Sequence, residues 1–293
     1  MKKQKITQQD YLKAHRKASR EEEIARHGRP ARFRAVHKSK KAYDRKREKA
    51  GLRNLPFSFH IKIKSSVGLD RHQRIEVIMS EVKGLLVMDV DSTLVQEEVI
   101  DLLGEEAGVG QEVAEITERA MRGELDFRQA LNERVATLKG LPESIFDKVY
   151  ARIHFNKGAK ELVDELHARG FKVGLVSGGF HETVDRLAAE AGIDYVKANH
   201  LEVVDGVLTG KVYGEIVTKD VKVAKLKDWA SENGLELSQT IAMGDGANDL
   251  PMIKTAGIGI AFCAKPIVRE QAPYQITEPD LYKVIEILDK VKK

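Results

Sequence analysis

The chain has 293 residues, of which 42% are hydrophobic and 32% are charged, and its formal net charge is +4. This length suffices to bury a sizeable core in one large domain or two smaller ones. No apolar run approaches the roughly 20 residues of a membrane helix, and no apolar segment follows the basic start of the chain. Cys263 is the only cysteine, which excludes an internal disulfide. We therefore expect a cytoplasmic protein.

The charge is unevenly distributed along the chain. Residues 1–55 hold 19 lysines and arginines against 6 acidic residues, a net charge of +13, which leaves −9 for the rest of the chain. We expect a basic extension that is partly helical or disordered. Such a stretch could bind a nucleic acid or a ribosome through the release of counterions. A charge run is more often a solvated tail, and the aromatic residues here are sparse and show no stacking pattern.

A short lead-in joins this extension to the main domain. Residues 57–63 alternate apolar and polar side chains, which is the period of a half-buried strand, and residues 70–83 can form a short helix. We place the lead-in at residues 56–83 and the main domain at residues 84–293.

The first strand of the main domain ends in the most informative motif. Four apolar residues, 85–88, run into Asp89-Val90-Asp91-Ser92-Thr93-Leu94. Because successive side chains of a strand point to opposite faces, Asp89 and Asp91 lie on the same side, at the carboxyl edge where open α/β sheets bind ligands. Two carboxylates at such a place are costly unless a cation or a reaction uses them.

The segment after the first strand is predicted to be an insertion. The pattern over residues 95–157 favours helices and indicates a cap placed before the helix Ala159 to Arg169. Beyond it, the apolar strand 171–176 runs into Ser177-Gly178-Gly179. A hydroxyl group and two bare amides suit phosphate oxygens, although such a triplet alone is usually only a turn. The pair Asp205-Gly206 indicates a hairpin.

The last third of the chain brings a second group of carboxylates. Lys222 opens an amphipathic helix, and the apolar strand 240–243 ends in Gly244-Asp245-Gly246-Ala247-Asn248-Asp249. A strand over residues 257–262 and a helix over residues 280–291 complete the series. This alternation of strands and helices predicts an α/β fold with a parallel sheet.

Taken in order, these motifs resemble the haloacid dehalogenase superfamily of aspartate-nucleophile phosphatases, over residues 85–290. Three segments resemble, more closely, the branch of that superfamily that hydrolyses phosphoserine: Asp89–Glu98, Met121–Phe127 and Arg134–Leu141. The resemblance implies a three-layer, Rossmann-like parallel sheet with an inserted helical cap at about residues 95–157.

The resemblance also implies roles for the core residues. Asp89 would attack phosphorus and form an aspartyl-phosphate, while Asp91 would protonate the leaving oxygen and later activate water. Mg²⁺ would be held by Asp89, Asp245 and the main-chain carbonyl of Val90 or Asp91, of which the family suggests Asp91, with Asp249 close behind. Lys222 would add a positive charge. The other predicted contacts to phosphate or substrate are Ser177, Gly178, Gly179 and Asn248.

Substrate choice depends on residues outside these motifs. Serine offers an ammonium and a carboxylate group, and Glu98 and Arg134 match the family's positions for these two contacts. Met121 and Phe127 would cover the closed site. From the residues alone, the favoured interpretation is that Arg134 is a surface partner of Glu133 and that Met121 and Phe127 are ordinary core of the cap, and only the resemblance reverses it. We expect Mg²⁺-dependent hydrolysis of O-phosphoserine, the last step of serine biosynthesis. The alternative is a related phosphatase or phosphotransferase that acts on another small phosphomonoester.

Overall fold

The computed structural model describes residues 81–291. The predicted basic extension and nearly all of the predicted lead-in lie outside the described residues. Within residues 81–291, no helix has the length and apolar character needed to cross a membrane.

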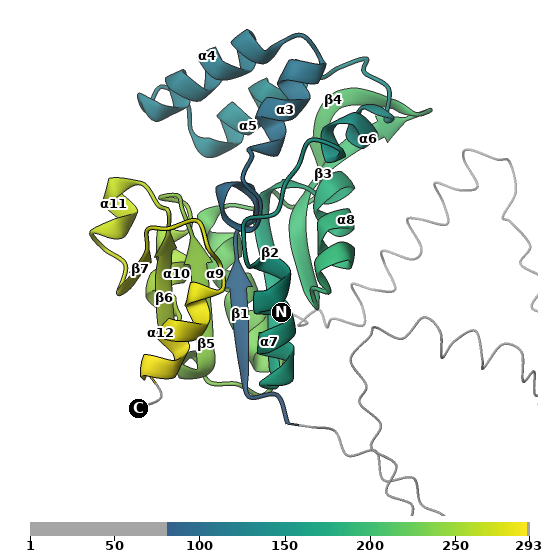
Figure 1. Cartoon of the computed structure of the whole chain (residues 1–293). Coiled ribbons are helices and arrows are strands. Elements are labelled where there is room, and N and C mark those ends of the chain that lie inside the picture. The colour runs from purple at the N-terminus through teal and green to yellow at the C-terminus, as the bar shows by residue number, and fades with distance from the viewer. Residues whose placement is uncertain (1–80, 292–293) are drawn as a thin grey trace, which may run out of the picture. The chain divides into compact units, whose positions relative to one another are not determined.

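A seven-stranded, mainly parallel sheet forms the base of the main domain (Figure 1). Its strand order is β4-β3-β2-β1-β5-β6-β7. The strands are β1 (Gly84–Met88), β2 (Phe171–Phe180), β3 (Tyr195–Val204), β4 (Val207–Tyr213), β5 (Thr240–Gly244), β6 (Ile258–Phe262) and β7 (Tyr274–Ile276). Among them β4 runs antiparallel to its neighbour β3. Since β1 pairs with both β2 and β5, the residues that follow these three strands meet at one edge.

Helices cover both faces of the sheet, which gives the three layers of the predicted α/β fold. One face packs against α7 (Ala159–Ala168), α8 (His181–Ala191) and α12 (Lys283–Val291), and the other against α9 (Lys219–Glu232) and α10 (Leu250–Thr255). A short helix, α11 (Pro266–Arg269), follows β6. Strands β1, β5 and β6 are buried along their whole length, as expected for parallel strands covered on both sides.

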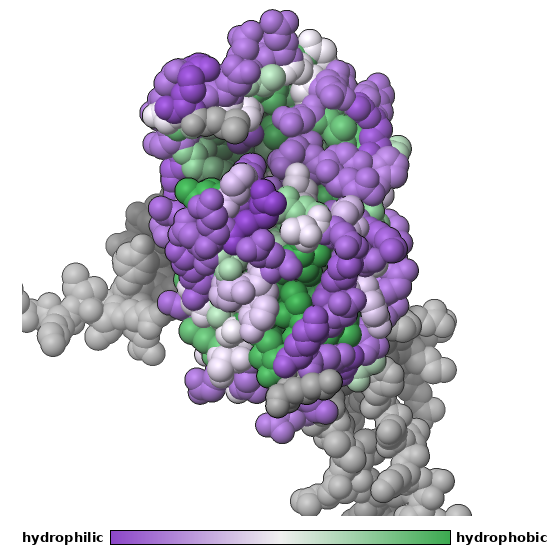
Figure 2. Space-filling model, turned by 60° about the vertical axis from the view of Figure 1, so that its left-hand side comes forward, coloured by the Kyte–Doolittle hydropathy of each residue, from purple (hydrophilic) through white to green (hydrophobic). Residues whose placement is uncertain are grey.

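Four further helices lie beyond the carboxyl end of β1, at the top of Figure 1. They are α3 (Val99–Glu106), α4 (Gly110–Met121), α5 (Phe127–Ala136) and α6 (Ile145–Tyr150), and we refer to them as the upper helices. Their core includes Leu103, Val113 and Leu131 and continues onto Leu201 and Leu208 of the β3–β4 hairpin. The upper helices occupy the predicted cap segment. Figure 2 shows a mainly hydrophilic surface, with hydrophobic residues visible between the upper helices and the sheet domain.

The chain crosses between the sheet and the upper helices at two places that lie side by side. Val95 and Phe155 form an antiparallel bridge. Next to it, Gln96 N donates a hydrogen bond to His154 O at 2.9 Å, and His154 Nδ1 lies 2.7 Å from Glu97 Oε1. The upper helices are therefore an insertion whose two ends meet.

Near the site, two predicted element boundaries differ from the structure. Lys222 does not open its helix: α9 begins at Lys219, because Thr218 caps it by accepting a hydrogen bond from Val221 N at 3.4 Å. Ser177-Gly178-Gly179 is not a turn after the strand. β2 continues through it to Phe180, with a shift of register against β3 between Val176 and Phe180.

Candidate active site

The loop after β1 presents Asp89 and Asp91 at the edge where β1, β2 and β5 end. The N–H of Asp89 donates to Met243 O of β5 at 3.1 Å, and Asp89 Oδ1 accepts from Val90 N at 2.8 Å. Residues Val90–Leu94 then form one wide, non-helical turn, which Val95 N closes by donating to Val90 O at 3.0 Å and in which Ser92 has a φ of +53°. This turn keeps both aspartates at the end of the strand.

Lys222 joins the loop after β1 to the loop after β5. Its ammonium group is buried, with Nζ 2.8 Å from Asp89 Oδ2 and 2.6 Å from Asp249 Oδ1. Burial acts to lower the pKa of Lys222, but the carboxylates of Asp249 and Asp89 outweigh it and raise the pKa overall. The lysine therefore stays charged and fixes two carboxylates from different strands.

Asp89, Asp245 and Asp249 form a carboxylate cluster. One oxygen of each lies within 4.8 Å of the others. Burial and the charges of Asp249 and Asp89 raise the pKa of Asp245 to about 7. Burial and the charge of Asp89 raise the pKa of Asp249 to about 6, although Lys222 opposes the shift. The lysine alone does not neutralise three carboxylates, so this all-oxygen donor set fits a hard divalent cation.

The side chain of Asp91 stands outside this cluster and has a different environment. Its Oδ1 accepts a hydrogen bond from Val99 N at 3.4 Å. Burial, then the negative charges of Glu98 and Asp89, raise the pKa of Asp91 well above its usual range. A carboxyl group with a raised pKa can serve as a proton donor. Glu98 lies close by, with Oε1 accepting from Ser92 Oγ at 2.8 Å.

The Ser177-Gly178-Gly179 segment lies against Asp91. Ser177 is fully buried and its Oγ accepts from Gly179 N at 2.9 Å. Asn199 Nδ2 donates to Gly178 O at 2.7 Å and holds the segment from behind. A methyl group at Gly179 would lie 3.2 Å from Asp91 Oδ2. Only a residue without a side chain lets the backbone approach the acid this closely.

Helix α5 brings two of the predicted substrate residues to the same place. A methyl group at Gly178 would lie 3.4 Å from Phe127 Cζ, so the ring reaches over that glycine. Burial lowers the pKa of Arg134, while the charges of Asp101, Glu98 and Asp91 act to raise it. These interactions place the Arg134 guanidinium among the site's acids.

The alternative reading of Arg134 as a surface partner of Glu133 does not hold. Glu133 Oε2 instead pairs with Arg119 Nη1 at 2.7 Å. The two remaining predicted residues belong to different parts of the chain. Met121 is the last residue of α4, and Asn248 lies in the loop after β5, with its Nδ2 3.5 Å from Asp249 Oδ1.

One residue near the site was not predicted. The N–H of Lys265 donates to Asp245 O at 3.1 Å, and its positive charge acts to lower the pKa of both Asp245 and Glu98. Lys265 follows the buried strand β6, as the predicted residues follow β1 and β5. This position after a buried strand could have indicated a site residue, but a single exposed lysine cannot be distinguished in the sequence from other surface charges.

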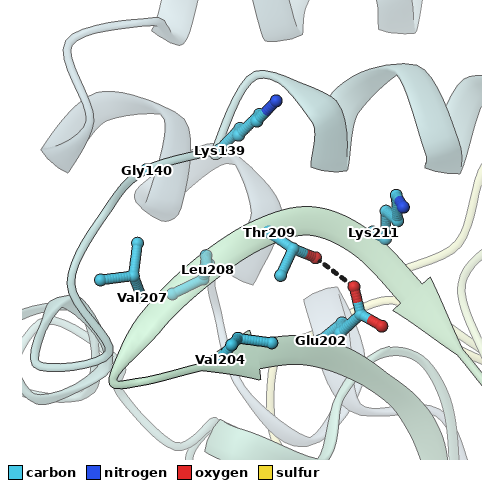
Figure 3. A pocket seen from close by; sticks show the side chains of 8 residues that line it. All are labelled: Lys139, Gly140, Glu202, Val204, Val207, Leu208, Thr209 and Lys211. Carbon is cyan, nitrogen blue, oxygen red and sulfur yellow. Dashed lines mark hydrogen bonds between the residues drawn. The ribbon is translucent and has the colours of Figure 1, made fainter.

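A surface pocket lies elsewhere, between the loop after α5 and the β3–β4 hairpin (Figure 3). Its volume is about 400 Å³, and it is lined in part by Lys139, Val207 and Lys211. The acid in this pocket, Glu202, already accepts a hydrogen bond from Thr209 Oγ1 at 2.6 Å. None of the predicted site residues lines the pocket, so it is separate from the candidate active site.

The fold and the carboxylate-rich site define a hydrolase of the haloacid dehalogenase type. The sequence matches the family of haloacid dehalogenase-like hydrolases over residues 86–254, and the chain belongs to this family. It is 94% identical over 215 residues to the phosphoserine phosphatase of Streptococcus thermophilus, a match that covers 73% of this chain and 100% of the relative. It is 62% identical over 209 residues to the phosphoserine phosphatase of Lactococcus lactis, covering 71% of this chain and 97% of the relative.

The chain is also similar to solved structures of phosphoserine phosphatases. A phospho-aspartyl intermediate analogue of phosphoserine phosphatase superposes with a TM-score of 0.66 at 46% identity, covering 70% of this chain and 98% of that one. A substrate-bound phosphoserine phosphatase complex superposes with a TM-score of 0.66 at 45% identity, again covering 70% and 98%.

Proposed function

We propose that this protein is a Mg²⁺-dependent phosphoserine phosphatase, which hydrolyses O-phosphoserine to serine and phosphate. The observation that carries the proposal is the placement of Asp89. It is fixed by Lys222 in a carboxylate cluster, and Phe127 and Arg134 of the upper helices reach the same site. The similarity to phosphoserine phosphatases over most of the chain supports the choice of substrate.

Asp89 is the nucleophile of the reaction. Its carboxylate is oriented by Lys222 Nζ on one oxygen and by the N–H of Val90 on the other. An oxygen of Asp89 forms a bond to phosphorus while the bond from phosphorus to the serine oxygen breaks, which leaves an aspartyl-phosphate. Asp91 supplies the proton to the departing serine oxygen. It then takes a proton from the water that releases phosphate from Asp89.

Mg²⁺ would be held by Asp89, Asp245 and the main-chain carbonyl of Asp91, with Asp249 beside them. When bound, the ion offsets the negative charge of the phosphate and allows a carboxylate to approach it. Two unit charges 4 Å apart repel by about 4 kcal/mol at an effective dielectric constant near 20, so this offset is essential.

The chain's own donors bind the remaining phosphate oxygens. We expect Ser177 Oγ and the N–H of Gly178 to donate to phosphate oxygens from β2, while the N–H of Gly179 orients Ser177 Oγ. Lys222 adds a positive charge from α9. Asn248 orients the phosphate from the loop after β5. These groups belong to rigid elements, and they need little rearrangement when the substrate arrives.

Recognition of the serine moiety uses the upper helices. Arg134 binds the carboxylate and Glu98 binds the ammonium group, because each offers the opposite charge beside the catalytic acids. Phe127 and Met121 cover the substrate and exclude water. A phosphomonoester without the amino-acid groups offers no opposite charge to Arg134 or Glu98, and we expect it to be a poor substrate.

A phosphate-release screen over small phosphomonoesters, with and without Mg²⁺, tests this function. We expect the highest kcat/KM for O-phosphoserine and no turnover after chelation. A better rate on another phosphomonoester, or transfer of the phosphoryl group to an acceptor other than water, would favour the related phosphatase or phosphotransferase.

A cytoplasmic location remains a prediction. So does the polyanion-binding tail, which a salt-dependent gel shift of the full chain against one starting near Leu55 would test.

A further inference from the structure

Asn156 lies outside every predicted motif, yet it makes three contacts to the loop that carries the site's acids. The residue is buried. Its side-chain Nδ2 donates to Thr93 O at 2.8 Å and to Val95 O at 3.2 Å, and its main-chain N–H donates to Leu94 O at 2.9 Å. One residue thus satisfies three consecutive carbonyl groups that lie 61–63 positions away along the chain.

The carbonyl groups that Asn156 binds belong to a loop that needs outside support. Leu94 and Val95 are fully buried, so without Asn156 their carbonyl oxygens would have no access to water. In the same turn the φ of +53° at Ser92 lies in the left-handed region, which serine rarely adopts. Such a backbone persists where its surroundings hold it in place.

Asn156 itself is held by the sheet domain. Its carbonyl accepts from Ala159 N at 3.2 Å at the start of α7, and the carbonyl of Lys157 accepts from Leu281 N at 2.8 Å. Gly158, between them, has a φ of +75°, and a methyl group there would lie 2.7 Å from Asp280 Oδ1. These contacts hold the main chain of Asn156 in place, so its side-chain amide can hold the loop in a defined position.

The loop carries one predicted site residue at each end. Asp91 lies on the β1 side. Glu98 lies on the α3 side and accepts from Ser92 Oγ at 2.8 Å. Val99 N donates to Asp91 Oδ1 at 3.4 Å, which links the two ends. A shift of the three carbonyl groups between them would move both acids relative to Asp89.

We propose that Asn156 is a positioning residue, whose side-chain amide sets the places of Asp91 and Glu98 in the active site. This inference rests on the proposed function, in which Asp91 transfers protons and Glu98 binds the ammonium group. An amide donor is required here, because an aspartate of the same size would direct a carboxylate at two carbonyl oxygens.

The variant Asn156→Asp tests this role, with Asn233→Asp as its matched control. Asn233 Nδ2 also donates to two oxygens, Trp229 O at 2.7 Å and Tyr195 Oη at 2.9 Å, but at the end of α9. At a temperature where circular dichroism shows both variants folded, we expect Asn156→Asp to lower kcat for phosphoserine about tenfold or more and to raise its KM. For an aryl phosphate, which has no ammonium group, kcat should fall with KM unchanged. Asn233→Asp should keep both constants within about twofold.

Hydrogen exchange gives a second measurement that does not depend on activity. We expect faster exchange over residues 91–98 in Asn156→Asp, with the strands of the sheet unchanged. Wild-type kcat, KM and exchange in that variant would overturn the proposal. Faster exchange in a chain whose wild type does not hydrolyse phosphoserine would support the loop-holding contact and refute the proposed function. If Asn156→Asp does not fold, Asn156→Ser, which keeps one hydrogen-bond donor, is compared with wild type in the same way. We then expect a smaller fall in kcat.

Discussion

Asp89 and Asp91 are two residues apart, and their surroundings are opposite. Asp89 Oδ2 lies 2.8 Å from the buried ammonium group of Lys222. Asp91 faces Glu98, and burial together with that charge raises its pKa well above the usual range. Asp91 lies inside the wide turn that directly follows Asp89, and this turn gives the two side chains different environments. We therefore infer that one motif supplies both a nucleophile held by a cation and a group able to donate a proton.

Replacing each acid by its amide should separate the two roles. We expect Asp89→Asn to lower the rate of phosphate release more than about a thousandfold, because an amide cannot form the aspartyl-phosphate. Asp91→Asn should also slow turnover but retain substrate binding, since the nucleophile and the cluster remain. Phosphate release measured beside calorimetric binding of phosphoserine checks both. Wild-type activity in Asp89→Asn would show that the nucleophile is assigned wrongly.

A second comparison concerns substrate recognition by Arg134. We expect Arg134→Ala to reduce kcat/KM for phosphoserine about a hundredfold while sparing an aryl phosphate, because only phosphoserine offers a carboxylate to the guanidinium group. Arg119→Ala is the control, since Arg119 belongs to the same upper helices and pairs with Glu133 at 2.7 Å. The control should leave both rates unchanged. Equal losses on the two substrates in Arg134→Ala would argue against its role in specificity.

At the scale of elements, the strands that carry motifs were predictable from the sequence. The apolar runs that precede Asp89, Ser177 and Asp245 correspond to β1, β2 and β5, since strands covered on both faces must be apolar throughout. The Asp205-Gly206 hairpin is also present, between β3 and β4. The short β7 was not predicted, because three residues are too few to show a period.

The contacts that arrange the site depend on residues far apart in the sequence, and single-segment patterns do not contain them. Asn156 and its partner carbonyls are separated by the whole of the upper helices. Lys265 reaches the site only because β6 lies beside β5. In both cases the residue type is ordinary and its neighbours give no periodic signal. Only the pairing of distant segments shows what these residues contact.

Asp194 joins elements of the sheet domain and makes its stability depend on pH. Its carboxylate lies 2.8 Å from His167 Nε2 of α7 and 2.6 Å from Lys172 Nζ of β2. It also accepts from Val173 N at 2.9 Å. Burial acts to raise the pKa of Asp194, but these hydrogen bonds outweigh it and lower the pKa. A carboxyl group with a lowered pKa stabilises the fold at neutral pH, and this contribution is lost as the pH falls through the folded-state value.

We therefore expect Asp194→Asn to reduce the free energy of unfolding by about 1–3 kcal/mol at pH 7 and by less at pH 3. Urea unfolding at both pH values measures the difference. Asp205→Asn is the control, because Asp205 is exposed in the hairpin turn, where asparagine tolerates the positive φ of 51°. A constant difference between wild type and Asp194→Asn at the two pH values would contradict the linkage.

At the scale of the whole molecule, we expect the carboxylate cluster to couple metal binding to stability. Burial, together with the charges of Asp249 and Asp89, raises the pKa of Asp245 to about 7, and a divalent cation would relieve the repulsion among the three carboxylates. At a Mg²⁺ concentration about a hundred times its Kd, the stabilisation is about 2.7 kcal/mol. For a domain of this size that corresponds to a rise in Tm of about 5–10 °C.

Thermal unfolding with chelator and with excess Mg²⁺ checks this expectation. In Asp245→Asn one negative charge is absent, so we expect a higher Tm than wild type in chelator and a smaller rise with Mg²⁺. Ca²⁺ provides a comparison of ion size, since it prefers more ligands at longer distances. An equal rise with Mg²⁺ in wild type and in Asp245→Asn would place the metal elsewhere.

The bridge between Val95 and Phe155 has a consequence for engineering and for evolution. Because the chain leaves the sheet domain and returns to it at the same point, the intervening residues form a cassette that can be exchanged without changing the order of the strands. A grafted cassette must bring apolar residues of its own, since Leu201 and Leu208 of the hairpin would otherwise face water. Within that condition, substrate range can diversify while the phosphate chemistry below it stays the same.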